Sequence, residues 1–238
     1  PFPVVSAPSG FAFGGGCEIL LHSDHVQLHA ETYTGLVEVG VGLIPGWGGC
    51  KELVLRYQEK EAAQYAKNAK MIDEDNKAIW FSPDKTPMGA IRKAFEIIAV
   101  ATVAKSGPEA KDIYFRGSDG VTMNRDRLLF DAKQKALELV EGYEAPVKRD
   151  DIRLPGPSGK MALDMAVADL RKSGKATPYD VTVSSALAKV LTGGDTDWTE
   201  PVNDEYLLKL ERDEFNKLVR NEGTMQRIEH MLAKGKPL

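Results

Sequence analysis

Apolar residues near the amino end of the chain occur in short runs separated by glycines and turns. Residues 3–13 are mostly apolar and predict a buried strand that runs into a loop. The triplet Gly14-Gly15-Gly16 follows, and residues 17–22 predict a short helix that Asp24 ends. Residues 26–30 alternate apolar and polar side chains, which predicts a second strand.

A glycine-rich stretch over residues 35–49 predicts irregular backbone, and a helix is predicted after it, over about 50–57. The first 57 residues therefore predict strand, helix, strand, loop and helix in that order. This order is typical of layered α/β domains.

Further along the chain, polar stretches alternate with helical spacing. Residues 58–88 are polar and weakly patterned, with a break at 82–84, and residues 89–105 predict an apolar helix. Residues 126–142 keep a helical period, and three prolines between residues 142 and 159 predict a linker.

Everything beyond this stretch predicts helices. One helix spans residues 184–192 and ends at the glycine pair 193–194. A second carries the charged stretch 209–220, which is expected to be a solvated face. The last helix starts at a cap on Thr224. Three sets of residues form the apolar faces: Leu163, Ala166, Val167 and Leu170; Leu208, Phe215, Leu218 and Val219; and Met225, Ile228, Met231 and Leu232.

Composition narrows the possible function classes. Of 238 residues, 42% are hydrophobic and 28% are charged, which is typical of a globular protein with a sizeable core. The net charge of −4 argues against a sequence-independent nucleic-acid binder, because that class carries a basic excess. Cysteine is sparse, and no apolar stretch approaches the ~18–20 residues of a membrane span. We therefore expect a cytoplasmic protein that binds neither nucleic acid nor membrane.

The triplet Gly14-Gly15-Gly16 is the first candidate for chemistry. Glycines let the backbone approach a ligand closely, and the N–H groups of a first helical turn have no partner within the helix. The triplet predicts either a site for an anion or oxyanion, or a turn that packs a helix closely on a strand. It lacks both the spacing of a dinucleotide-binding loop and the lysine of a phosphate-binding loop.

Glu18 and Glu38 are the second candidate. Glu18 falls in an apolar first helical turn, and Glu38 is the only charged residue between Thr32 and Lys51. A carboxyl group in apolar surroundings has a raised pKa, which suits proton transfer near neutral pH. Either acid alone is more simply a structural carboxylate. The two together, beside a glycine loop, predict a pair that holds a water molecule.

The histidines and a tryptophan are weaker candidates. His22, His25 and His29 have no cysteine or second carboxylate nearby to complete a metal site, and the last two are expected on the outer face of a strand. Both cysteines are expected to be inert packing residues. Trp47 either lines a ligand tunnel or plugs the core.

Residues 9–24 (Ser-Gly-Phe-Ala-Phe-Gly-Gly-Gly-Cys-Glu-Ile-Leu-Leu-His-Ser-Asp) resemble the central signature of the crotonase, or enoyl-CoA hydratase/isomerase, superfamily. The resemblance is strong over residues 1–57, and the 20-residue separation of Glu18 and Glu38 is similar to that in the family's hydratases. Residues 227–237 resemble the carboxyl end of a bacterial protein in which a 3-hydroxyacyl-CoA dehydrogenase is followed by a hydratase half.

The resemblance implies a crotonase-like (ClpP/crotonase) α/β core over residues 1–145, with an insertion at about 58–95, and an all-helical carboxyl-terminal region over 146–238. It also implies that Glu18 and Glu38 are the catalytic acid and base, and that Gly15 donates its N–H to an oxyanion hole. The implied substrate-binding residues are Gly14, Gly16, Pro45, Gly46 and Trp47.

The implied reaction adds water across the C2–C3 double bond of a 2-enoyl-CoA thioester in fatty-acid β-oxidation. It needs no metal or cofactor, because CoA is part of the substrate, and NAD belongs only to a fused dehydrogenase domain outside this chain. The family's first oxyanion donor lies upstream of the strand at which this chain starts. We therefore expect an N-terminally truncated core that an upstream segment completes, within an oligomer. Alone, the chain is expected to leave a sheet edge uncovered and to be inactive as a hydratase.

Two alternatives stay open. A Δ3,Δ2-enoyl-CoA isomerase needs one carboxylate to shuttle a proton, so Glu18 would be dispensable in it. A non-catalytic assembly module would use its helical tail to dock a partner domain. The presence of both acids favours the hydratase.

Overall fold

The strands of the computed structural model form two small parallel sheets. The structure describes residues 1–71 and 88–238. One sheet has the order β1-β3-β5, and the other pairs β2 with β4 from Gly10 opposite Thr32 to Phe13 opposite Gly35. The strands are β1 (Val5–Ser6), β2 (Gly10–Phe13), β3 (His25–His29), β4 (Thr32–Gly35) and β5 (Gly120–Thr122).

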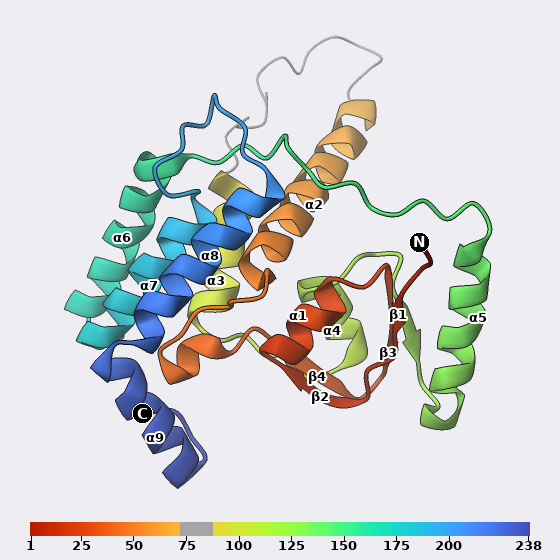
Figure 1. Ribbon diagram of the computed structural model, residues 1–238, viewed down its shortest axis with the longest axis horizontal. Helices are drawn as coiled ribbons and strands as arrows, with labels where there is room; N and C mark the ends of the chain where they lie inside the picture. Colours follow the sequence, from red (N-terminus) through yellow and green to blue (C-terminus); the bar gives the residue numbers. More distant parts are fainter. Residues whose placement is uncertain (72–87) are drawn as a thin grey trace.

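Helices make up most of the rest. In Figure 1, α1 and α4 lie with the strands in one part of the molecule, α6, α7 and α8 pack in a row in another, and α2 runs between the two parts. α5 packs against β1 and β3. The helices are α1 (Gly15–Leu21), α2 (Gly49–Met71), α3 (Met88–Ala99), α4 (Gly107–Ile113), α5 (Leu128–Val140), α6 (Gly156–Lys172), α7 (Pro178–Leu191), α8 (Asp204–Val219) and α9 (Glu222–Lys234), with 3₁₀ turns η1 (Glu38–Val41) and η2 (Arg125–Arg127).

Residues 3–13 contain two strands in different sheets, not the single strand predicted. Pro8 lies between them, and a proline has no N–H to donate to a sheet. Its carbonyl accepts hydrogen bonds from the backbone N–H of His29 and the hydroxyl of Thr32, each at 3.0 Å. The chain therefore passes from one sheet to the other at this proline.

β1 lies at the edge of its sheet. Within the described residues it pairs only with β3, and Phe2 and Val4 beside it are 77% and 49% exposed.

The boundaries of α2 and α3 differ from the predictions. α2 continues to Met71, although residues 58–71 lack an apolar period; residues 61–64 within it are exposed, so this part of the helix needs no buried face. The Lys60 ammonium fastens it by donating to the carbonyl of Asp112 at 2.7 Å. α3 ends at Ala99 because Ala104 and Thr34 exchange two backbone hydrogen bonds, at 2.9 and 3.1 Å. The predicted break at 82–84 lies outside the described residues.

The stretch expected to be a linker is packed against the rest of the molecule. Ile152 and Leu154 are fully buried, and Ile152 pairs with Val202 in an antiparallel bridge. α6 begins at Gly156, inside this stretch. Beyond it the structure is helical, as predicted, and Gly193 follows the end of α7 with a φ of +85°. α7 begins at Pro178, six residues before the predicted start, because Thr177 and Asp180 form a capping box there.

α9 does not start at a cap on Thr224. Asn221 caps it by accepting a backbone N–H at 2.9 Å, while Thr224 is buried and donates to the carbonyl of Gly42 at 2.8 Å. The guanidinium of Arg227, one turn further on, donates to the carbonyl of Val39 at 3.4 Å. α9 is therefore fastened to η1 and to the residue that follows it.

His25 and His29 do not lie on an outer face, as predicted. They are 4% and 5% exposed, because α5 packs against β3. His25 lies 3.6 Å from the carboxylate of Asp119, and His29 accepts the N–H of Glu31. Residues 1–71 and 88–238 contain no group of three or more His, Cys, Asp or Glu that could hold a metal ion. They also contain no helix long and apolar enough to cross a membrane.

Candidate active site

The glycine triplet lies at the start of α1. Gly14 precedes the helix with a φ of +54°, a left-handed conformation that favours glycine, and its N–H donates to the carbonyl of Gly35 at 2.9 Å. Gly15 and Gly16 begin the first turn, whose N–H groups have no partner within the helix. All three glycines are partly exposed, so a ligand can approach this stretch of backbone.

Glu18 belongs to the same helical turn and is only 3% exposed. Its Oε1 atom accepts the N–H groups of Trp47 and Gly49, at 2.8 and 2.9 Å. Its Oε2 atom lies 4.0 Å from the position that a Cβ on Gly15 would take. One oxygen of Glu18 therefore holds the loop before α2, and the other faces the glycine triplet.

Glu38 reaches the same glycines from η1. Its Oε1 atom lies 3.2 Å from the position of a Cβ on Gly14, and its Oε2 atom is buried with no hydrogen-bond partner in the described part of the chain. Burial raises the pKa of Glu38 to about 7; its own N–H opposes this shift, and the charge of Glu18 adds to it. A carboxyl group with this pKa can take up and release a proton near neutral pH.

Trp47 covers the glycines from the loop before α2. Its ring lies 3.5 Å from the position of a Cβ on Gly15, and the residue is 70% exposed, so it does not plug the core. Beside it is a cavity of about 460 Å³, lined in part by His22 and Phe215. Pro45, in contrast, is buried against Gly49 and does not face the glycine triplet.

A third buried acid, Glu211 of α8, lies near the site and was not predicted. It is fully buried, although the stretch around it was expected to be a solvated face. Its Oε1 atom accepts the N–H of Gly48 at 2.6 Å, and its Oε2 atom accepts that of Lys51 at 3.4 Å. Burial raises the pKa of Glu211 to about 8; these two N–H groups oppose the shift, and the charges of Glu18 and Glu38 add to it.

The sequence did carry a signal for this acid. Leu207 and Leu218 are buried on one face of α8, and Glu211 and Glu214 lie between them at helical spacing, 3–4 residues apart. A charged residue in register with an apolar stripe faces the core. The charged composition of residues 209–220 obscured this register.

Both cysteines agree with the expectation of packing residues. Cys17 and Cys50 are buried and free. Burial raises the pKa of the Cys17 thiol to about 12, and it raises that of Cys50 well above the ordinary range. At neutral pH neither thiol therefore supplies the thiolate that a nucleophile needs.

Solved structures identify the fold. The chain is similar to a carnitinyl-CoA hydratase from Mycobacterium avium, with a TM-score of 0.52 and 17% identity over 99% of this chain and 62% of that one. It is also similar to an enoyl-CoA hydratase/isomerase from Pseudoalteromonas atlantica, with a TM-score of 0.52 and 14% identity over 99% and 64% of the two chains. Identities this low show the fold alone, which is the α/β crotonase fold.

Sequence comparison identifies the family. Residues 1–79 match the family described as enoyl-CoA hydratase/isomerase. A Bacillus subtilis protein named "Probable 3-hydroxyacyl-CoA dehydrogenase" is 37% identical over 238 residues, which are 99% of this chain and 27% of that protein. The "Fatty acid oxidation complex subunit alpha" of Idiomarina loihiensis is 38% identical over 103 residues, which are 43% of this chain and 12% of that protein.

The comparisons place residues 1–79 of the chain in the enoyl-CoA hydratase/isomerase, or crotonase, superfamily. The chain spans about a quarter of the length of the Bacillus relative and a smaller share of the Idiomarina one.

Proposed function

We propose that this chain carries the acid pair and one oxyanion donor of an enoyl-CoA hydratase. The reaction adds water across the C2–C3 double bond of a 2-enoyl-CoA thioester, as in fatty-acid β-oxidation. One observation carries the proposal: Glu18 and Glu38, 20 residues apart in the sequence, meet at Gly14 and Gly15.

The two acids hold a water molecule between them. One carboxylate takes a proton from this water while the water oxygen bonds to C3. The electron pair of the double bond moves towards the thioester. The other acid, in its carboxylic form, then gives a proton to C2. Negative charge builds on the thioester oxygen in the transition state, where the N–H of Gly15 stabilises it by about 3–4 kcal/mol.

The remaining site residues bind the substrate in this proposal. Gly14 and Gly16 let the thioester approach the backbone closely. Trp47 and Gly46 line the cavity of about 460 Å³, which takes the acyl chain. Pro45 acts only through the loop, because it is buried beneath it.

The longer relatives support a larger arrangement. The hydratase product is a 3-hydroxyacyl-CoA, which a 3-hydroxyacyl-CoA dehydrogenase would oxidise with NAD. The name of the Bacillus relative fits a protein in which this chain forms the hydratase part. In the proposed arrangement an upstream segment supplies the first oxyanion donor and completes the fold, and the assembly is oligomeric. The hydratase step itself uses no cofactor.

The test is the ultraviolet assay with crotonyl-CoA on the full-length protein that carries this chain. Hydration removes the conjugated double bond, so absorbance falls. Glu38→Gln should abolish the fall, while Glu31→Gln, at an exposed position, should leave it intact. Wild-type protein that folds and binds CoA esters but does not hydrate crotonyl-CoA would overturn the proposal.

One observation favours the isomerase as a second candidate. Glu18 already uses its Oε1 atom to hold the N–H groups of Trp47 and Gly49, whereas Glu38 has a buried oxygen without a partner in the described residues. A single free carboxyl group is all that a Δ3,Δ2-enoyl-CoA isomerase needs. Glu18→Gln separates the two candidates, because it should stop hydration but spare conversion of 3-enoyl-CoA to 2-enoyl-CoA.

A further inference from the structure

We propose that Glu211 is a positioning residue of the candidate site, so that α8 forms part of it. The proposal takes from the proposed function what the site does. The positioning role itself is inferred from the hydrogen bonds of Glu211, independently of the reaction.

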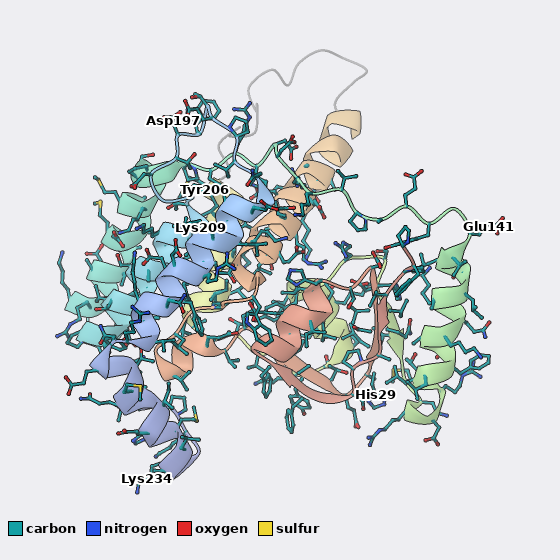
Figure 2. All side chains as sticks on the ribbon, in the orientation of Figure 1. His29, Glu141, Asp197, Tyr206, Lys209 and Lys234 are labelled. Carbon is teal, nitrogen blue, oxygen red and sulfur yellow. The ribbon has the colours of Figure 1, made fainter. Side chains whose placement is uncertain are left out.

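One face of α8 packs against the loop over residues 46–48. Leu208, Glu211 and Phe215 are spaced by three and four residues, which places them on one side of the helix. The Leu208 side chain lies 3.1 Å from the position of a Cβ on Gly48, and the Phe215 ring lies 2.8 Å from that on Gly46. These glycines allow the close approach of helix and loop. Figure 2 labels Tyr206 and Lys209, which mark the course of α8.

Glu18 and Glu211 divide the backbone N–H groups of this loop between them. Glu18 accepts those of Trp47 and Gly49, and Glu211 accepts the one between them, of Gly48. Two carboxyl groups from distant parts of the sequence therefore hold three successive N–H groups. Without Glu211, the buried N–H of Gly48 would lose its acceptor, and the loop would have to rearrange. Trp47 and the Glu18 carboxylate are bonded to the same loop and would move with it.

Glu214 of the same helix provides a matched comparison. It is 7% exposed, and its Oε1 atom forms ion pairs with the ammonium groups of Lys189 and Lys217, at 3.0 and 2.7 Å. Its partners are therefore lysines and not the loop. A general loss of stability in α8 should follow a change at either acid. A change in the loop should follow only a change at Glu211.

The experiment compares Glu211→Leu, Glu211→Gln and Glu214→Leu. Leucine fills the space but accepts no hydrogen bond, whereas glutamine keeps an acceptor for Gly48; Glu211→Met replaces the leucine variant if that does not fold. The first readout is the fluorescence of Trp47 in the full-length protein, taken for each variant as the difference from the same variant with Trp47→Phe. Glu211→Leu should change the emission and acrylamide quenching of Trp47. Glu211→Gln should restore them, and Glu214→Leu should leave them unchanged.

The second readout is turnover of crotonyl-CoA by the full-length protein. Glu211→Leu should lower kcat by about 10²-fold, the effect of a catalytic group displaced by about 1 Å, with KM little changed. The proposal would be overturned if Glu211→Leu showed the same Trp47 signal and the same kcat as Glu214→Leu. If the wild-type protein hydrates no enoyl-CoA, the proposed function fails. The Trp47 signal then still decides whether Glu211 positions the loop.

Discussion

The Oε1 atom of Glu38 lies 3.2 Å from the point where a Cβ on Gly14 would stand. Gly14 also has a φ of +54°, which side chains rarely allow. Two independent constraints, one from the backbone and one from the acid, therefore require glycine at this position.

Gly14→Ala should reduce both stability and turnover. The positive φ of Gly14 costs an alanine about 1–3 kcal/mol, and the new methyl group would displace the Glu38 carboxylate, lowering kcat by at least about tenfold. Gly174→Ala is the control, because Gly174 has a φ of +74° but nothing within 4 Å of an added Cβ. It should show a similar loss in thermal unfolding and unchanged turnover. Equal turnover in the two variants would mean that Glu38 takes no part in the reaction.

The two acids should behave as one unit in kinetics. Glu18→Gln and Glu38→Gln should each lower kcat for hydration by about 10²–10⁴-fold, because each removes a proton-transfer group while keeping the side chain's shape. The double variant should be little worse than either single one, since one water is held by both. Binding of a CoA ester, measured by calorimetry, should persist in all three. Multiplicative losses would mean that the acids act separately.

The rate of hydration should depend on pH through Glu38. Its pKa is raised to about 7, so kcat/KM should change slope near pH 7. A rate that rises through this pH assigns Glu38 as the base, and a rate that falls assigns it as the acid. Glu38→Gln should remove this inflection from whatever activity remains. An inflection that persists in this variant belongs to another group.

The stability of the fold should fall as pH rises, because of Glu211. Its pKa is raised from 4.5 in the unfolded chain to about 8 in the folded protein. The folded state thus favours the protonated form of Glu211. Its contribution to the free energy of unfolding is therefore fully present below about pH 4.5 and is lost as pH rises to about 8. The loss is about 1.4 kcal/mol per unit of pKa difference. Urea unfolding at pH 6 and pH 8.5 measures this loss. Glu211→Gln should remove the larger part of this loss and leave the part below about pH 7, which Glu38 contributes through its own raised pKa of about 7. Glu214→Gln should leave the loss unchanged.

The N–H of Gly15 should be necessary for turnover. Gly15→Pro removes this N–H at the first position of α1, where proline is tolerated in helices. Hydration should fall by about 10²–10³-fold, the loss seen when one oxyanion donor is removed. Circular dichroism must show an unchanged helix content for the comparison to hold. Full activity with a normal spectrum would contradict the oxyanion role.

The sequence predicted the parts of the site that lie close together along the chain. The glycine triplet, Glu18 and Glu38 fall within 25 residues, and their local pattern of glycines and isolated acids is visible without a fold. β3 and α1 were also predicted nearly to their ends, because apolar spacing sets them locally.

What the sequence did not predict depends on distant contacts. The bond from Gly48 to Glu211 spans 163 residues, and that from Thr224 to Gly42 spans 182. No local pattern indicates which loop a side chain will meet at such separations. The split of residues 3–13 into two strands had the same cause, because the partners of Pro8 come from His29 and Thr32.

The attachment of α9 to η1 has a consequence for how the protein is made. During translation Glu18 and Glu38 are made before Thr224 and Arg227, which bond to η1 and the residue after it and come much later in the sequence. Glu211, which holds the neighbouring loop, is also synthesised late. The nascent polypeptide therefore contains both acids before the residues that fasten η1, which carries Glu38, and the loop over residues 46–48 have been made.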